Sequence, residues 1–290
     1  MLNLKEINYN KDVPEVVALL RSSLSENHTI GNFLWKHTES PFGESYGLLA
    51  RDKDEIVGVR MFMFWEFIKG NNLIKALRPV DTVTHPNYRG QGIFKKLNLA
   101  GVENCQGKFD LIFNTPNDNS IKGNLKLGWN KFPKKLDYKI SIFSPQKVTS
   151  KIISVKEIDD EVLSLDSNFY KTNHSKDYLR WRYQDSTYKA IKLEVNTHKL
   201  YVIFRIQKIK GITLIVLNEV FGDPQYHTAA VRTLCYRFKT IFVHHLNTQF
   251  VSISSLMSLS RNNSEVLYRD DKKSIIKRVL FSSGDLEGKI

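Results

Sequence analysis

The stretch from residue 78 to residue 97, RPVDTVTHPNYRGQGIFKKL, constrains the fold more than any other part of the sequence. Its first part alternates β-branched with other residues and predicts a strand. Pro86 ends that strand, because proline lacks an amide N–H and restricts the residue before it. The segment RGQG at 89–92 then opens a helix whose apolar residues recur at helical spacing. This strand–turn–helix unit predicts an α/β fold.

The two glycines at the start of the expected helix, Gly90 and Gly92, predict an anion site. Glycine lets the backbone come close to a ligand, and the first N–H groups of a helix have no partner within it. The helix dipole adds positive potential there, so a phosphate or pyrophosphate is the expected ligand. A P-loop would need Lys followed by Ser or Thr, and a dinucleotide fingerprint would need a third glycine where Lys95 stands.

The sequence RGQGIF at 89–94 resembles motif A of the GCN5-related N-acetyltransferases, whose consensus is Gln/Arg-x-x-Gly-x-Gly/Ala. Arg89 and Gly92 match this consensus, and Phe94 takes the place of its last small residue. An ordinary glycine turn before a helix is the alternative interpretation. The order of strand, His-Pro, Tyr-Arg-Gly and helix favours the acetyltransferase motif.

A second resemblance lies at residues 117–129, NDNSIKGNLKLGW, which is similar to motif B of the same family. Four positions match or substitute conservatively: Asn117, Ser120, Gly128 and Trp129. Asn124 stands where the family usually has tyrosine. Two motifs in the family's order are much less expected by chance than either motif alone.

The chain contains an internal similarity between FLWKHTES at 33–40 and LRWRYQDS at 179–186, each followed by strand-like runs, which suggests a duplicated unit. The second copy lacks Arg-x-x-Gly, and Asp223 in its place would repel a phosphate. We therefore expect two tandem acyl-CoA N-acyltransferase-like domains. Residues 1–146 would bind acetyl-CoA, and residues 147–290 would form a degenerate copy that binds no coenzyme but shapes the substrate cleft.

The expected elements of the first domain follow the order β-α-α-β-β-β-α-β-α-β, with a strand at 136–143 that closes its sheet. In the second half we expect a helix at 228–246 and strands at 249–255 and 274–282.

The net charge of +13 is spread evenly, because residues 1–150 hold 21 Lys and Arg against 15 Asp and Glu, and the remainder holds 22 against 15. Such a distribution favours anionic ligands and argues against nucleic-acid binding, which needs a basic tail or block. The spacing of Cys105 and Cys235 indicates neither a disulfide framework nor a metal site. No apolar run is long enough for a bilayer, and the early charges argue against a signal peptide, so we expect no membrane partner and a cytoplasmic location.

The resemblance to the acetyltransferases also implies roles for individual residues. The thioester carbonyl would meet a backbone N–H near Val83 or Thr84. The pyrophosphate would lie on the backbone amides of the glycine turn and the first helical turn, with Asn117 also on the coenzyme side. The residues of that turn are Arg89, Gly90, Gln91, Gly92, Ile93 and Phe94.

Asp81 is the one carboxylate on the expected strand and would take the proton of the acceptor amine. An equally good interpretation is that Asp81 pairs with Arg78 or another cation. Asn124 replaces the family's general acid and can hydrogen-bond a sulfur without giving up a proton. Tyr88, Tyr138 or water would then protonate the thiolate. Candidates for the acceptor side are Trp35, His37, Trp65 and Glu66.

Together these observations predict an acetyl-CoA-dependent N-acetyltransferase that acts on a primary amine of a small molecule, with an amino sugar as one option, and that needs no metal. Two alternatives stay open: a non-catalytic coenzyme-A-binding module, and an aminoacyl transferase of the tandem-domain type that modifies cell-wall peptides. The sequence leaves open the acceptor, the acyl chain length and the oligomeric state.

Overall fold

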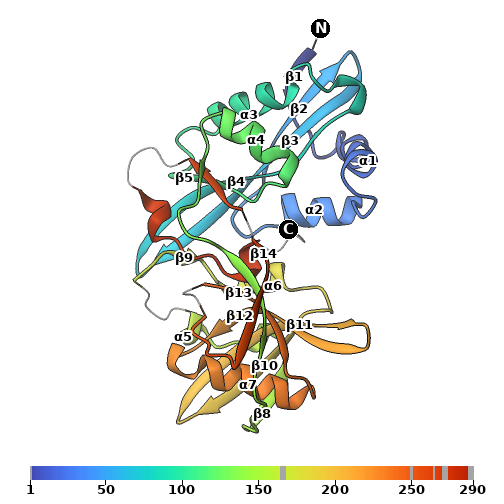
Figure 1. The fold of residues 1–290 in the computed structure, drawn as a ribbon. Helices are drawn as coiled ribbons and strands as arrows, with labels where there is room; N and C mark the ends of the chain where they lie inside the picture. Colours follow the sequence, from blue (N-terminus) through green and yellow to red (C-terminus); the bar gives the residue numbers. More distant parts are fainter. Residues whose placement is uncertain (1, 164–167, 249–250, 264, 270–273, 287–290) are drawn as a thin grey trace. The chain divides into compact units, whose positions relative to one another are not determined.

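The computed structural model describes residues 2–163, 168–248, 251–263, 265–269 and 274–286, which form two compact units (Figure 1). The first unit contains Met1–Phe67, Leu73–Phe132 and Val266–Ile276. The second contains Ile68–Asn72, Pro133–Glu265 and Lys277–Ile290. These units differ from the expected domains 1–146 and 147–290, because residues 133–146 belong to the second unit and residues 266–276 return to the first.

The first unit is a sheet whose strands follow the order β1-β2-β3-β4-β5-β15-β6. The strands are β1 (Leu2–Glu6), β2 (Tyr46–Asp52), β3 (Glu55–Lys69), β4 (Asn72–Thr84), β5 (Leu111–Asn114), β6 (Asn130–Lys131) and β15 (Leu267–Arg269). The helices are α1 (Val13–Ser23), α2 (Ile30–Thr38), α3 (Ile93–Asn104) and α4 (Asp118–Lys126), with the 3-10 turn η1 (Pro86–Tyr88) before α3.

Alternation along β3 sorts the helices onto the two faces of this sheet. Val59 and Met61 join the core beneath α1 and α2, whereas Phe62 packs beneath α3. The approach of α3 to the sheet requires a residue without a side chain, since a Cβ added to Gly101 would overlap the Phe62 ring. The site described below is therefore built from both faces of one sheet.

Strands β4 and β5 are parallel neighbours that pair only over a short stretch of their described residues and then separate. Within the described strands they pair at Ala76 with Leu111 and at Leu77 with Ile112. Strand β4 then runs on to Thr84, while β5 continues beside β15, where Leu267 pairs with Asn114. The carboxyl half of β4, which carries Asp81, Val83 and Thr84, has therefore separated from β5 when it reaches the start of α3.

The second unit holds a seven-stranded sheet in the order β14-β7-β13-β12-β11-β10-β8. Its strands are β7 (Asp137–Ile142), β8 (Ser150–Ile153), β10 (Lys189–Val195), β11 (His198–Ile209), β12 (Ile212–Phe221), β13 (Phe242–Asn247) and β14 (Met257–Asn263). The shorter elements are η2 (Val155–Glu157), α5 (Asp160–Leu163), β9 (Lys171–Thr172), α6 (Lys176–Arg182), η3 (Pro224–Tyr226) and α8 (Ser283–Leu286). Helix α7 (His227–Arg237) packs Val231 and Leu234 onto this sheet.

The strand expected at 136–143 was wrongly assigned to the first sheet. It is β7, and it pairs antiparallel with β13 and β14 in the second sheet. Strand β15 lies beside β5 in its place. The local pattern identifies β7 as a strand. Its partner strands lie about a hundred residues further along the chain, so the local periodicity of the sequence does not indicate which strands it pairs with.

Three further expectations for the second half were wrong. The helix expected at 228–246 ends at Arg237, and its last part forms β13, because Lys239 adopts a positive φ of 50° that breaks the helix. Residues 251–255 form no strand, and Ile275–Arg278 is the 3-10 helix η4 rather than a strand. Residues 249–250 and 270–273 lie outside the described part of the chain.

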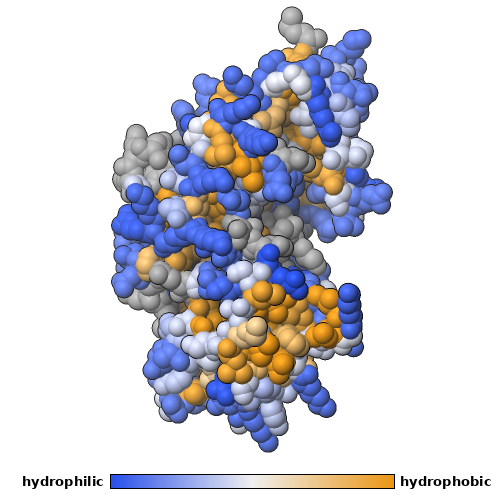
Figure 2. All heavy atoms as spheres, viewed as in Figure 1, coloured by the Kyte–Doolittle hydropathy of each residue, from blue (hydrophilic) through white to orange (hydrophobic). Residues whose placement is uncertain are grey.

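None of the helices in the described ranges has the length and hydrophobicity that a membrane crossing requires. Figure 2 shows hydrophobic side chains gathered on the viewed face of the second unit. Leu256, Met257 and Leu259, at the edge strand β14, are large apolar side chains that are each more than half exposed.

Candidate functional site

The start of α3 has the backbone geometry that an anion site needs. Gly90 and Gly92 have φ values of +79° and +75°, in the left-handed region that glycine tolerates. A Cβ at either position would meet no heavy atom within 4 Å, so both glycines face open space. The N–H of Lys96 donates to the carbonyl of Gly92, whereas the N–H groups before it in the first turn have no acceptor within the helix. This exposed, positively polarised helix start suits a phosphate.

Buried contacts hold this start in place. Ile93 lies in the core with Leu97, so the first helical turn is anchored on the sheet. The preceding turn η1 is capped by His85, whose Nδ1 accepts the N–H of Asn87 at 3.3 Å. Tyr88 donates its hydroxyl to Asp52 at 3.0 Å, and this hydrogen bond raises the pKa of Tyr88. The side chains of Arg89 and Gln91 are exposed.

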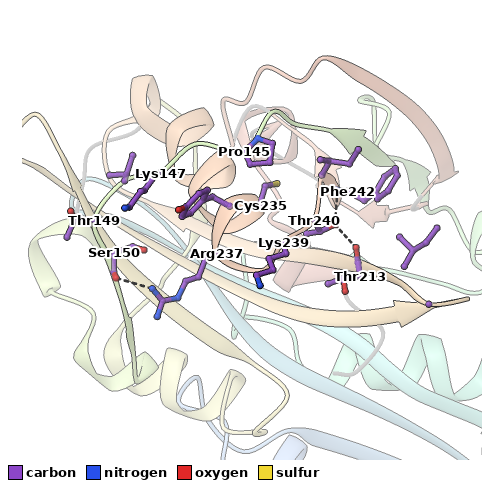
Figure 3. A pocket seen from close by; sticks show the side chains of 15 residues that line it. Pro145, Lys147, Thr149, Ser150, Thr213, Cys235, Arg237, Lys239, Thr240 and Phe242 are labelled. Carbon is purple, nitrogen blue, oxygen red and sulfur yellow. Dashed lines mark hydrogen bonds between the residues drawn. The ribbon is translucent and has the colours of Figure 1, made fainter.

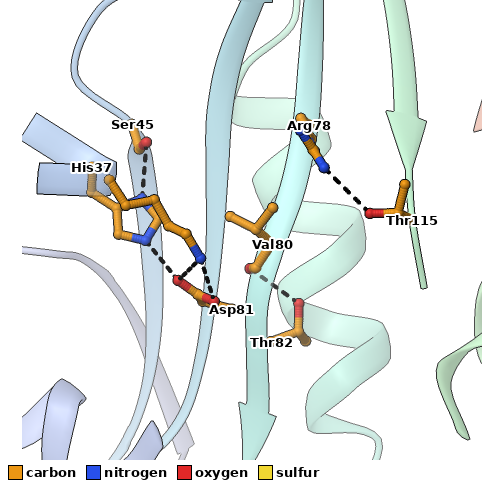
Figure 4. Close-up of polar contacts among 8 residues, drawn as sticks. His37, Ser45, Arg78, Val80, Asp81, Thr82 and Thr115 are labelled. Carbon is orange, nitrogen blue, oxygen red and sulfur yellow. Dashed lines mark hydrogen bonds and ion pairs between the residues drawn. The ribbon is translucent and has the colours of Figure 1, made fainter. Parts of the chain in front are cut away.

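Asp81 lies in the carboxyl half of β4 with a positive φ of 43°, a conformation that few residues other than glycine adopt. Both of its carboxylate oxygens accept from Lys36 Nζ at 3.0 Å, and Oδ2 lies 2.9 Å from His37 Nε2 (Figure 4). His37 Nδ1 lies 3.0 Å from Ser45 Oγ. Because an ionised carboxylate only accepts, His37 donates from Nε2, and its Nδ1 accepts from Ser45.

Burial and pairing set the protonation states of this cluster. The side chains of Asp81 and Lys36 are 10% and 11% exposed, and that of His37 is fully buried. Burial alone would raise the pKa of Asp81, but the charge of Lys36 and the hydrogen bond from His37 outweigh it and hold that pKa below its ordinary value. Burial lowers the pKa of His37. The carboxylate of Asp81 is therefore ionised and the imidazole of His37 neutral near pH 7.

The cation that pairs with Asp81 is Lys36, not Arg78. The Arg78 guanidinium lies over the rings of Trp65 and Phe113, at 5.0 and 5.5 Å from their centroids, and its Nη2 lies 3.5 Å from Thr115 Oγ1 (Figure 4). Of the acceptor-side candidates, His37 joins Asp81, while Trp65 is a buried core residue. Sequence reasoning missed Lys36, although it directly follows the tryptophan of the internal similarity.

Val83 and Thr84 lie on β4 beyond Asp81, next to the turn that leads to α3. The side chain of Val83 is buried in the core beneath α1 and α2, so this residue can offer a ligand only its backbone. The structure brings the two residues, Asp81 and the glycine turn onto one continuous segment of the chain.

Asn124 and Asn117 make structural contacts in α4. Asn124 is fully buried; its Oδ1 accepts from Asn98 Nδ2 of α3 at 3.2 Å, and its Nδ2 donates to the Ser120 carbonyl at 2.9 Å. Asn117 is the N-cap of α4 and accepts the Ser120 N–H at 3.1 Å. The amide of Asn124 thus joins α3 to α4 and is engaged at both ends.

Arg60 on β3 is a buried cation that sequence reasoning did not single out. It is 1% exposed, and its Nη1 donates to Thr82 Oγ1 of β4 at 3.0 Å. Its guanidinium lies 5.3 Å from the centroid of the Phe94 ring in α3, and burial lowers the pKa of Arg60 to about 9. An arginine within the apolar run IVGVRMFMFW at 56–65 is the sequence signal that marks it.

The second unit has a strand, turn and helix in the same order, β12-η3-α7, but its helix start differs. Helix α7 begins directly after η3, without glycines, and Asp223 caps the turn. The N–H of Ser252 lies 3.3 Å from His227 Nδ1, and that of Ser254 lies 2.9 Å from Thr228 Oγ1. The chain itself therefore covers the first turn of α7.

The second unit also buries a carboxylate on β12. Glu219 Oε1 accepts from Tyr183 Oη at 2.6 Å and from Ser282 Oγ at 2.7 Å, and it lies 3.5 Å from His174 Nε2. Asp285 is buried close by and accepts from Thr172 Oγ1 at 2.6 Å. Burial and the nearby charge of Glu219 raise the pKa of Asp285.

A pocket of about 1070 Å³ lies in the second unit, between the segment around Pro145 and the end of α7 (Figure 3). Two of its polar side chains already hold the backbone: Arg237 donates to the Ser150 carbonyl at 3.2 Å and Thr240 to the Thr213 carbonyl at 2.6 Å. The pocket contains none of the predicted site residues. Across the described residues, no three His, Cys, Asp or Glu side chains come together as a metal site.

Solved structures share the fold of this chain. A GCN5-related N-acetyltransferase from Anabaena variabilis superposes with a TM-score of 0.73 at 9% identity, over 93% of this chain and 73% of the other. A conserved protein of unknown function from Enterococcus faecalis, described as a probable N-acyltransferase, gives 0.72 at 12% identity over the same shares. A GCN5-related N-acetyltransferase from Kribbella flavida gives 0.67 at 13% identity, over 93% and 71%.

No family model matches the chain, and no curated protein matches its sequence. The chain nevertheless has the fold of the GCN5-related N-acetyltransferases, which confirms the α/β fold expected from the two motifs.

Proposed function

We propose that the protein is an acetyl-CoA-dependent N-acetyltransferase whose first unit carries the reaction and whose second unit is a degenerate copy. The observation that carries the proposal is the glycine-capped start of α3, which follows a strand that has separated from its parallel neighbour. The shared fold supports the same reading.

The coenzyme contacts follow from this geometry. The N–H groups of residues 90–94 hold the pyrophosphate, because they lie in the glycine turn or the first helical turn. The N–H of Arg89 instead donates to the Pro86 carbonyl at 3.3 Å. The thioester end lies along β4, where a backbone N–H of Val83 or Thr84 polarises the carbonyl. The even positive charge of the chain favours this polyanionic co-substrate.

The acceptor is a primary amine on a small molecule, and Asp81 binds it. Lys36 already places an ammonium on both oxygens of this carboxylate, 3.0 Å away, and so stands in for the ammonium of an acceptor. His37, fully buried and neutral, fixes the carboxylate on its other side. An incoming ammonium replaces Lys36 at Asp81 and is held beside the thioester.

The reaction balances without a metal. The ammonium loses its proton by way of the Asp81 carboxylate, directly or through water. The free amine attacks the thioester carbon, a C–N bond forms, and the C–S bond breaks. The departing thiolate takes its proton from water, since Asn124 is buried and Tyr88 is bonded to Asp52.

A thiol-release assay tests this function. Wild-type protein is incubated with acetyl-CoA and a panel of primary amines that includes amino sugars, and each amine is matched with its N,N-dimethyl analogue as a control. We expect one equivalent of free coenzyme A and one of N-acetylated product for at least one primary amine, and none for its tertiary analogue. If neither the primary nor the tertiary amines cause release of coenzyme A from a protein that still binds acetyl-CoA, the proposed catalysis is contradicted.

A non-catalytic coenzyme-A-binding module is the second candidate. Two observations favour it: Asn124 is engaged at both ends, and Asp81 is a weakened base while Lys36 and His37 hold it. The aminoacyl transferases of cell-wall assembly are a weaker alternative, because the intact glycine turn of α3 argues for a phosphate ligand.

A further inference from the structure

Arg60 carries a positive charge that no described group of the protein neutralises. The residue is 1% exposed, and burial is the cause that lowers its pKa, with no carboxylate beside it. Within the described part of the chain, its hydrogen bond goes to a neutral hydroxyl, Thr82 Oγ1. Its Nε and Nη2 are buried without a hydrogen-bond partner among the described residues.

A buried guanidinium in this state is costly. Charged groups that leave water are normally paired, and two unmet N–H donors add their own desolvation penalty. The rings of Phe62 and Phe94, at 5.5 and 5.3 Å from the guanidinium carbon, compensate only in part. An arginine kept under these conditions is expected to meet its counter-ion in a bound ligand.

We propose that Arg60 binds a carboxylate at the free end of the acyl group, so that the preferred co-substrate is a dicarboxylic acyl-CoA such as succinyl-CoA. This inference rests on the proposed function. Thr82, the partner of Arg60, directly follows Asp81 on the part of β4 that has left β5. The guanidinium therefore lies beside the strand along which the thioester is expected.

Burial distinguishes the acyl carboxylate from the coenzyme's phosphates as the partner. The backbone that would hold the pyrophosphate, residues 89–92, is exposed, whereas Arg60 is almost completely buried. The Phe94 ring packs on the guanidinium from α3, and it also contacts α4, where a Cβ added to Gly123 would lie 3.1 Å away. An anion paired with Arg60 would therefore lie beneath α3, away from the exposed start of that helix.

Calorimetric titration of coenzyme A, acetyl-CoA and succinyl-CoA tests the inference. The proteins are the wild type, Arg60→Met, Arg60→Lys and, as a control, Arg51→Met, which removes a partly exposed arginine paired with Asp12. Wild type should bind succinyl-CoA at least about 10-fold more tightly than acetyl-CoA, because the acyl carboxylate forms a charge-assisted hydrogen bond with Arg60. Arg60→Met should remove this preference and leave acetyl-CoA binding unchanged, while Arg51→Met keeps both.

Three results would overturn the proposal in different ways. Equal affinity of wild type for both acyl-CoAs removes the carboxylate site and leaves the proposed function standing. An equal loss of all three ligands in Arg60→Met assigns the pyrophosphate as the partner. Failure of wild type to bind any of the three ligands removes the proposed function itself. If Arg60→Met does not fold, the wild type and Arg60→Lys, which keeps the charge, still decide between these outcomes.

Discussion

The two units place a buried carboxylate at the same point of their strand–turn–helix segments, but the groups that surround this carboxylate differ between the units. Asp81 lies four residues before His85, the cap of η1, and Glu219 lies four residues before Asp223, the cap of η3. The partner of each carboxylate follows a tryptophan by two positions: His37 after Trp35, and Tyr183 after Trp181. The internal similarity of the sequence therefore coincides with a repeated contact.

The difference lies in what closes each carboxylate. Asp81 binds an ammonium, and both side chains keep about a tenth of their surface exposed. Glu219 is sealed by Ser282 and by Gly284, where an added Cβ would overlap both Tyr183 Oη and Glu219 Oε1. The helix starts differ in the same sense, since α3 opens with glycines and α7 is covered by Ser252 and Ser254. One arrangement is open to a ligand, and the other is filled by its own chain.

The largest effect is expected from exchanging each carboxylate for its amide. Asp81→Asn leaves Lys36 without its counter-ion and should lower the free energy of unfolding by about 3 kcal/mol and acetyl transfer about 100-fold. Asn also tolerates the positive φ, so backbone strain is not added. Glu219→Gln, the matched variant of the second unit, should change transfer by less than about 2-fold, because its amide oxygen still accepts from Tyr183 and Ser282.

Urea titration and the thiol-release assay measure both variants. Equal losses of transfer in Asp81→Asn and Glu219→Gln would show that the two carboxylates are equivalent and would break the comparison.

A smaller effect is expected from opening the seal of the second unit. Gly284→Ala forces a methyl group into Tyr183 and Glu219 and should lower the free energy of unfolding by about 2.5 kcal/mol. Acetyl-CoA affinity should stay the same, because the change lies in the second unit. Gly31→Ala in α2, where a Cβ meets nothing within 4 Å, is the control and should be neutral or slightly stabilising. A loss of coenzyme affinity in Gly284→Ala would place the coenzyme in the second unit.

Acid should weaken the second unit through His245. Burial lowers the pKa of His245 to about 4, so below its unfolded pKa the unfolded chain binds the proton and the folded chain does not. Stability is therefore lost as pH falls from about 6.5 towards 4, by about 2 kcal/mol between pH 7 and pH 5. His245→Gln should remove this part of the pH dependence in urea titrations at the two pH values. The same slope in His245→Gln and wild type would contradict the assignment, and His198→Gln, which changes an exposed histidine, serves as control.

The local features of the site could be predicted from the sequence because glycine, proline and capping residues act over a few residues. Pro86, Gly90 and Gly92 predicted the turn and the helix start. The prediction of an anion site at residues 89–94 rests on the same local chemistry. Each of these features depends on the conformation of its own residue.

Features that depend on tertiary contacts could not be predicted in this way. Asp81 was expected to serve as a base or to pair with a cation, but the partner, Lys36, lies 45 positions earlier on α2. The exchange of β7 and β15 between sheets joins segments about 100 or more residues apart, which periodicity cannot reveal. Arg60 is visible in the sequence as a charge in an apolar strand, but its unmet donors appear only once Thr82 and Phe94 are placed.

Calorimetric titration of acetyl-CoA into wild type, Gly92→Glu and Gly107→Glu tests the central claim most directly. Both glycines have positive φ, +75° and +78°, and both face open space, so the two variants carry equal strain and equal charge. Gly92 begins α3, whereas Gly107 follows its far end. We expect wild type and Gly107→Glu to bind alike and Gly92→Glu to lose about 100-fold or more in affinity, because a carboxylate replaces the phosphate at the helix start. Equal binding by all three proteins, or no binding by the folded wild type, would contradict a coenzyme site in the first unit.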